Sequence, residues 1–187
     1  MDRINFNRSV KMHEVCEKKV IEGYPDCICF KDGNAYVTNR HLLVCNKIDE
    51  ICNFELEQRD LLEGKALPPD SYKKILEYEK AVITEDGIEC VDEKKGKSFF
   101  EFYAPEQIDG QPPKEMPNFE SVFSEQKAKL ISSADRLAMN LDFLSKIKNS
   151  LYSEDNGYVV SYYESALIVK PVNEFCSGRA LLMLITF

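Results

Sequence analysis

The order of apolar and polar positions predicts a mixed chain of short helices and many short strands. Apolar residues at helical spacing predict helices over residues 9–22, 71–79 and 141–151. Alternating or continuous apolar runs predict strands over residues 27–30, 35–38, 41–48, 81–84, 88–91, 99–103, 130–133, 158–163, 166–169 and 180–187. The order helix, then several strands, therefore recurs along the chain.

Local signals set several boundaries of these elements. Ser9 and Asp70 are residue types that cap helices, so we expect them to start the first two. Asp-Gly pairs at 32–33 and 86–87 predict tight hairpins. Residues 49–63 are acidic and favour neither pattern. Tight hairpins imply antiparallel sheets, so we expect an α+β fold with antiparallel sheets and a layer of helices.

Two stretches of the chain align without gaps. Residues 66–75 and 138–147, which are 72 positions apart, coincide at an Ala, an Asp, a Lys and an Ile. Repetition of one supersecondary unit indicates duplication, and it favours a function of the assembled surface over a single catalytic cluster. The third predicted helix carries an apolar face made of Leu141, Leu144, Ile147 and Leu151.

Composition narrows the class of protein. The 187 residues suit one large domain or two small ones, and 44% hydrophobic residues are ample for a core. A net charge of −8 disfavours general electrostatic binding of nucleic acid, although it allows local basic surfaces. No apolar run is long enough for a bilayer and the N-terminus lacks a secretory pattern, so we expect a cytoplasmic protein without a membrane partner.

Residues with catalytic or metal-binding chemistry are sparse. The seven Cys fit reduced thiols, and Cys27 and Cys29 on one face of a strand are expected to be core residues. His13 is expected to be exposed, and His41 has no adjacent nucleophile pattern. Gly-rich phosphate loops and ligand spacings for zinc are missing. We therefore expect no enzyme, no catalytic residue, no metal and no cofactor.

Five segments carry a resemblance to one family. They are residues 37–45, 65–68, 116–123, 139–144 and 180–187. The first resembles an Ala-Thr-Asp-Gly-His-Arg-Leu-Ala-Val stretch, and the last a Val-Val-Met-Pro-Met strand, of the bacterial DNA polymerase sliding clamp, the β processivity subunit. All five follow the order of that family from its middle domain to its end.

The resemblance implies a DNA-clamp-like fold of repeated β-α-β-β-β half-domains. Residues 1–110 would form a clamp-like domain of two half-repeats, 111–128 a linker, and 129–187 an additional half-domain. The family's chain has six half-domains and its ring twelve. Four copies of this chain would supply that number, and a monomer or dimer that closes no ring stays open as the alternative.

The resemblance also implies a groove that captures short peptides of polymerases and other replication proteins. The groove candidates are Thr38, His41, Leu43, Pro68 and Met183, which match by type, and Leu184 and Ile185, which replace a Pro and a Met. Departures from the family occur at Asn39, Arg40 and Leu42, where it has Asp, Gly and Arg. These apolar residues could equally be ordinary core.

Clamps of this family encircle double-stranded DNA with helices lining the hole. Lys73, Lys74, Lys146 and Lys148 are candidates to face a phosphate backbone, although mixed charges on these helices also suit a solvated face. We expect a non-enzymatic sliding-clamp-like protein that binds DNA, replication-protein peptides or both, as a processivity factor or scaffold. The alternative is a monomeric clamp-fold interaction module or a regulator of replication that does not encircle DNA.

Overall fold

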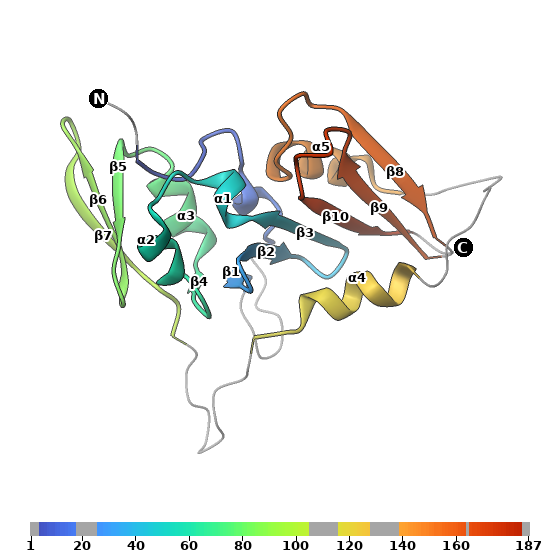
Figure 1. Cartoon of the computed structure of the whole chain (residues 1–187), viewed down its shortest axis with the longest axis horizontal. Coiled ribbons are helices and arrows are strands. Elements are labelled where there is room, and N and C mark those ends of the chain that lie inside the picture. The colour runs from blue at the N-terminus through green and yellow to red at the C-terminus, as the bar shows by residue number, and fades with distance from the viewer. Residues whose placement is uncertain (1–3, 18–25, 105–115, 128–138, 164, 185–187) are drawn as a thin grey trace, which may run out of the picture.

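Two antiparallel sheets form the frame of the molecule (Figure 1). The computed structural model describes residues 4–17, 26–104, 116–127, 139–163 and 165–184. The larger sheet has seven strands in the order β4-β1-β2-β3-β10-β9-β8, and the smaller has the order β5-β6-β7. The strands are β1 (Ile28–Lys31), β2 (Asn34–Thr38), β3 (Leu42–Lys47), β4 (Ala66–Leu67), β5 (Lys80–Ile83), β6 (Gly87–Asp92), β7 (Gly96–Glu101), β8 (Tyr158–Tyr162), β9 (Ala166–Pro171) and β10 (Arg179–Met183).

Short helices complete the fold. They are η1 (Met12–Glu14), a 3₁₀ turn, and α1 (Ile48–Ile51), α2 (Leu56–Asp60), α3 (Pro69–Ile75), α4 (Phe119–Lys127) and α5 (Leu141–Ser150). One order recurs three times: η1, α3 and α5 each precede three consecutive strands paired as an antiparallel meander. Both α3 and α5 begin at positions that align in the predicted repeat, and both contact η1. The expected α+β fold with antiparallel sheets is confirmed.

The hairpin between β1 and β2 turns at the Asp-Gly pair, as predicted. Asp32 and Gly33 have φ of 52° and 71°, the left-handed values that a tight two-residue turn demands. The second predicted Asp-Gly turn differs, because Gly87 is already the first residue of β6. A Cβ on Gly87 would lie 2.4 Å from the carbonyl oxygen of Phe100, so this glycine permits close approach of two strands.

The helix predicted over residues 9–22 is wrong where the structure describes it. Residues 9–17 hold only the single 3₁₀ turn of η1, and residues 18–22 lie outside the described residues. The N–H of Lys11 donates to the carbonyl of Asn149 at 2.7 Å, which draws this segment onto α5. Tertiary contacts of the segment thus override its helical spacing.

Two further expectations need adjustment, and a third is not tested. Asp70 is not the cap of α3, because Pro68 occupies that position and the helix begins at Pro69. Proline suits the first turn of a helix since the N–H that it lacks has no intrahelical partner. The strand predicted over 130–133 lies outside the described residues, and the last strand ends at Met183.

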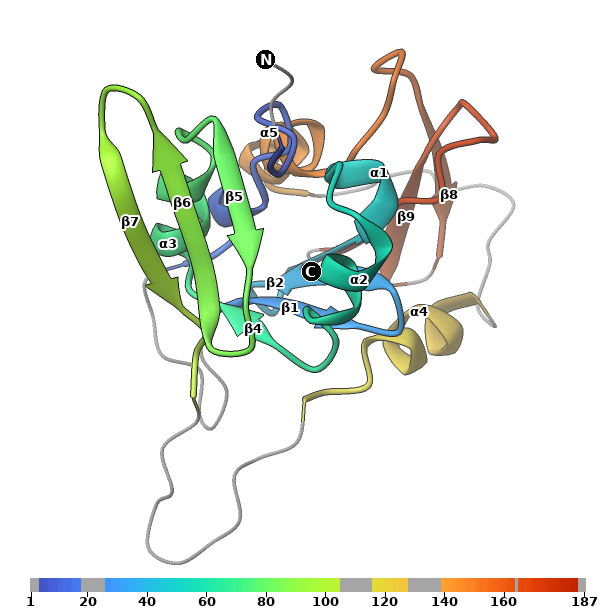
Figure 2. The same ribbon diagram turned by 60° about the vertical axis from the view of Figure 1, so that its left-hand side comes forward.

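Each face of the large sheet has its own apolar core. The helix-side core contains β-strand residues such as Val37, Val44 and Leu182 together with residues of η1, α3, α5 and the small sheet. Figure 2 shows α3 behind the small sheet, which closes this side. The α4-side core contains the alternate strand residues and the two buried phenylalanines of α4, Phe119 and Phe123. Strand alternation thus divides the sheet between two cores.

Two predicted burial patterns have different outcomes. Cys27 and Cys29 are both buried in the α4-side core, as expected. The apolar face predicted for α5 is only half right: Ile147 is buried, whereas Leu141 is 72% and Leu144 is 40% exposed. The face of α5 that packs on the helix-side core thus includes Ile147 and the partly buried Phe143 rather than Leu141 and Leu144.

Candidate functional site

The turn between β2 and β3 is held by one buried amide. Asn39 Oδ1 accepts hydrogen bonds from the N–H groups of His41 at 3.1 Å and Leu42 at 2.8 Å. Arg40 has φ of 75° at the position where the resembling family has glycine, a backbone conformation that disfavours non-glycine residues by about 1 kcal/mol. Its N–H donates to Thr38 Oγ1 at 3.2 Å. The turn therefore forms without glycine because side chains around it stabilise it.

Four of the groove candidates meet beside this turn. Leu43 of β3 lies opposite Thr38 of β2 on one side and Leu181 of β10 on the other. The Met183 N–H donates to the His41 carbonyl at 2.8 Å. We call Thr38, His41, Leu43 and Met183 the turn site. Segments far apart in the sequence thus contribute to one end of the large sheet.

The side chains of the turn site differ in exposure. Leu43 is buried, Thr38 and Met183 are half-buried, and His41 is exposed with its ring stacked 6.1 Å from that of Phe143. Leu43 and Met183 belong to or pack against the α4-side core. The turn site therefore combines apolar side chains on the α4 side with the His41 ring, which lies against Phe143 of the helix-side core.

Two of the remaining groove candidates, Pro68 and Leu184, lie away from the turn site. Pro68 follows β4, and β1 lies between β4 and β2, so one strand separates it from the strand of Thr38. Leu184 packs against the helix-side core, on the opposite face from Met183. Ile185 lies outside the described residues. The turn site is therefore smaller than the sequence-based set.

Helix α4 lies against the same face of the sheet, next to the turn site. The ring of Phe119 stacks on that of Tyr36 with centroids 4.8 Å apart, and the Arg179 guanidinium lies 4.4 Å from the centroid of Phe123. The Glu120 carboxylate accepts from the Tyr36 hydroxyl at 2.8 Å and is ion-paired with Arg179. Aromatic contacts and a charge-assisted contact therefore hold α4 against the sheet.

Burial keeps the groups beneath α4 neutral. It raises the pKa of Tyr36, and it raises the pKa of the Cys45 thiol to about 11. The Tyr36 hydroxyl thus stays a donor to Glu120 at neutral pH. The sequence predicts a linker over residues 111–128, whereas Phe119–Lys127 form α4. Two phenylalanines four residues apart are the local signal for this amphipathic helix.

The four candidate DNA-facing lysines are not equivalent. Lys73 and Lys74 on α3 and Lys148 on α5 are exposed. Lys146 Nζ lies 3.7 Å from Glu17 Oε1 and 5.5 Å from the ring centroid of Phe143, so its charge is partly compensated. Lys73 also lines a hollow of the surface.

That hollow lies between η1 and α3 and has a volume of about 670 Å³. The side chains lining it are Arg8, Lys11, His13, Glu14, Lys73, Leu76, Glu77 and Lys95. Lys11 lies 3.6 Å from Glu14 and Lys95 is paired with Glu77. His13 is half-buried rather than exposed, and burial lowers its pKa. Cations outnumber carboxylates here, in contrast to the acidic chain as a whole.

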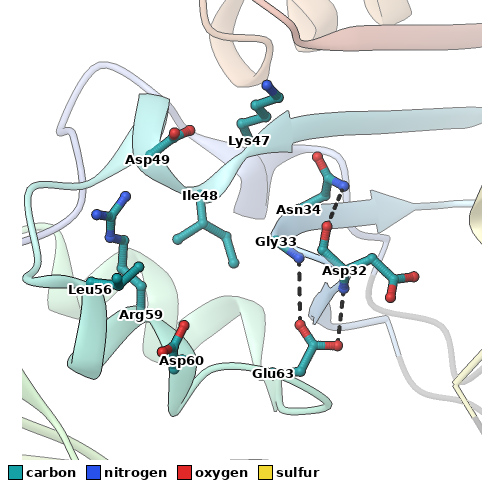
Figure 3. Close-up of a pocket in the computed structure, with 10 residues that line it drawn as sticks. All are labelled: Asp32, Gly33, Asn34, Lys47, Ile48, Asp49, Leu56, Arg59, Asp60 and Glu63. Carbon is teal, nitrogen blue, oxygen red and sulfur yellow. Dashed lines mark hydrogen bonds between the residues drawn. The ribbon is translucent and has the colours of Figure 1, made fainter.

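A second pocket, of about 560 Å³, lies between the β1–β2 turn and α2 (Figure 3). Glu63 points to the turn, and its carboxylate accepts from the N–H groups of Asp32 at 3.0 Å and Gly33 at 3.5 Å. Within the described ranges, no group of three His, Cys, Asp or Glu side chains is arranged for a metal ion. The contacts of Glu63 give this pocket a role in fixing the hairpin.

The sheets, the repeated helix-and-meander units and the helix layer define the fold of the DNA sliding clamp. Among solved structures, the chain is similar to the Helicobacter pylori β clamp bound to a DNA ligase peptide, with a TM-score of 0.58, 16% identity and coverage of 99% of this chain and 65% of that one. It is also similar to the DNA polymerase III β subunit of Thermotoga maritima, with a TM-score of 0.55, 12% identity and coverage of 96% and 62%.

A third match is the Pseudomonas aeruginosa DNA polymerase sliding clamp, with a TM-score of 0.53 and 11% identity over 98% of this chain and 67% of that one. The chain thus spans about two thirds of the length of these clamps. No protein-family model and no curated protein matches the sequence. The likeness is one of fold. None of the helices in the described part of the chain is long and apolar enough to cross a membrane.

Proposed function

We propose that this chain is a non-enzymatic clamp-fold protein that captures short peptides of replication proteins at the turn site. The observation that carries the proposal is that Met183, from the end of the sequence, meets Thr38, His41 and Leu43 of the β2–β3 segment. By type, these four residues also match positions of the peptide groove in the clamp family that the sequence resembles. The Helicobacter pylori clamp in the comparison holds a DNA ligase peptide, which supplies a ligand to test.

The chemistry of the turn site suits a peptide with apolar side chains. Leu43 and Met183 offer an apolar surface on the α4 side, and Thr38, two residues after the buried Tyr36 of the same strand, adds a hydroxyl on that face. Peptide-binding grooves combine apolar pockets for anchors with a few polar groups that fix orientation. A scaffold role in replication follows if the captured peptide belongs to a polymerase or a repair protein.

The test is a binding titration with a fluorescently labelled DNA ligase peptide. Met183→Asp places a charge on the apolar surface, and it should weaken binding at least about tenfold, as expected for loss of an interface anchor. Phe175→Asp is the matched control, because Phe175 is 91% exposed and lies before β10, at the opposite end of that strand from Met183. Equal affinity of the wild type and Met183→Asp would remove the proposal.

A second candidate function, contact with duplex DNA, is supported by the basic hollow between η1 and α3. Arg8 and Lys73 line it without a carboxylate partner among the described ion pairs. Lys73→Glu should then weaken binding to a labelled duplex and lower the slope of log affinity against log salt by about one. Lys170→Glu, an exposed lysine of β9, is the control. Undetectable duplex binding at low salt would leave the alternative, an interaction module that does not encircle DNA.

Domain division and assembly belong to the same proposal. We propose that residues 1–110 form a clamp-like domain, that residues 111–128, which include α4, form a linker, and that residues 129–187 form an additional half-domain. β3 from the first part pairs with β10 from the last, which supports a single folded body. Light scattering distinguishes a 21.5 kDa monomer from a tetramer that could close a ring.

A further inference from the structure

Helix α4 is a locally complete, amphipathic unit. Asn118 Oδ1 accepts from the Ser121 N–H at 3.2 Å, and the Ser124 hydroxyl donates to the Glu120 carbonyl at 3.0 Å. Phe119 and Phe123 are buried against the sheet, whereas Val122 on the other side of the helix is 39% exposed. The described polar contacts that α4 makes with the sheet run through Glu120. A small set of side chains therefore determines docking.

The surface under α4 is continuous with the turn site. Phe119, Phe123 and Leu43 belong to one apolar cluster, and Met183 packs against that cluster. Figure 1 shows α4 along the large sheet, on the side away from α3 and α5. A peptide that used Leu43 and Met183 would therefore extend toward the place of α4.

We propose that α4 is an internal ligand of the peptide surface, so that a partner peptide competes with it. This inference rests on the proposed function of the turn site. Its physical basis is that a helix with anchors at i and i+4 docks in the same manner as helical peptides that bind apolar grooves. A nine-residue helix has little stability of its own, so α4 is helical because it is docked. Displacement by a peptide would uncover Tyr36 and Arg179.

Glu120 is the best point at which to undock α4 without disturbing the strands. Its carboxylate lies between the Tyr36 hydroxyl and the Arg179 guanidinium. Glu120→Arg brings two guanidinium groups together, which repels α4 from the sheet while every sheet residue stays unchanged. Phe123→Ala is an independent variant that removes an apolar anchor. Val122→Ala is the matched control on the exposed side of the same helix.

The experiment measures two labelled probes against the full chain and its variants by fluorescence anisotropy. The first probe is a synthetic peptide of residues 116–127, and the second is the DNA ligase peptide. Wild type and Val122→Ala should bind the 116–127 peptide weakly because their own α4 occupies the surface. Glu120→Arg and Phe123→Ala should bind both probes roughly tenfold more tightly, because apparent affinity scales with the open fraction.

Two results would overturn the inference. One is a 116–127 peptide that binds both docking variants no better than it binds the wild type. The other is a DNA ligase peptide that binds all chains with the same affinity, since α4 would then not compete. Absence of any ligase-peptide binding in every chain would count against the turn-site function, while the 116–127 probe would still decide whether α4 is exchangeable. Circular dichroism and urea midpoints verify that each variant is folded.

Discussion

The two faces of the large sheet are covered in different ways. The helix-side face is closed by several elements, and its centre is aromatic: the Phe6 ring packs 6.0 Å from that of Phe30 and 5.3 Å from that of Tyr72. The α4 side combines small buried residues such as Cys27 and Cys29 with larger ones such as Tyr36, under a single described helix. One face is held by many mutually packed side chains, and the other by a few anchors.

This difference separates stability from binding. Side chains that pack against several elements at once cannot move without opening the core, so the helix-side face determines the free energy of unfolding. A cover attached through two phenylalanines and one carboxylate can leave as a unit, which suits a surface that exchanges ligands. The contrast predicts a graded set of effects when each face is altered.

The largest effect is expected for Phe6→Ala on the helix side. Phe6 is fully buried and also makes an edge contact with Phe54 at 5.1 Å. Removal of a buried phenylalanine from such a site should lower the free energy of unfolding by about 4 kcal/mol, measured by urea denaturation. A loss below about 1 kcal/mol would mean that this face is not the stability core.

A smaller loss is expected for Asn46→Leu, which breaks the link between β3 and the end of α5. The buried Asn46 amide donates to the Ser150 carbonyl at 2.9 Å and accepts from the Tyr152 N–H at 2.8 Å. Leaving both backbone groups unsatisfied should lower stability by about 2–3 kcal/mol. Asn173→Leu serves as control, since its contact with Glu154 is exposed and should contribute little. Equal urea midpoints for Asn46→Leu and its control would contradict the prediction.

Phe123→Ala should have a lesser effect than either change, although Phe123 is as buried as Phe6. The loss cannot exceed the free energy with which α4 docks, because the helix can detach while the sheet stays folded. We expect about 1–2 kcal/mol in the same urea experiment, below the usual value for a buried phenylalanine. If Phe123→Ala matched Phe6→Ala, the two faces would be equivalent and the comparison would fail.

The sequence predicted those parts of the fold that local chemistry determines. The turn at Asp32 and Gly33 needs left-handed backbone, and Asp-Gly signals it. The predicted start at residue 141 is also correct, and there the Asn140 side chain accepts from the Asp142 N–H at 3.0 Å. In contrast, the conformation of the segment that holds η1 depends on its hydrogen bond to the Asn149 carbonyl. No local sequence pattern could have indicated that contact.

The candidate site, too, has a part that the sequence could indicate and a part that it could not. Resemblance selected Thr38, Leu43 and Met183, and strand pairing then brought them together. The role of α4 was not predictable, because the Glu120–Arg179 pair joins residues 59 positions apart and a helix signal does not say where a helix docks. Which helix covers which face of the sheet is decided only when the whole chain folds.

The smallest expected effect concerns pH and belongs to the helix side. Burial lowers the pKa of His13 below its usual 6.5, although Glu14 opposes this shift, and Lys73 and Lys11 reinforce it. Between the lowered pKa and 6.5 the unfolded chain binds more protons than the folded one, so stability rises with pH in that window. The contribution of His13 to stability is complete above pH 6.5 and is lost as pH falls through the folded-state pKa.

His13→Gln should therefore flatten the dependence of the urea midpoint on pH below 6.5, whereas Phe123→Ala should leave that slope unchanged. An unaltered slope in His13→Gln would place the acid sensitivity elsewhere and would separate it from the packing of η1 on α3.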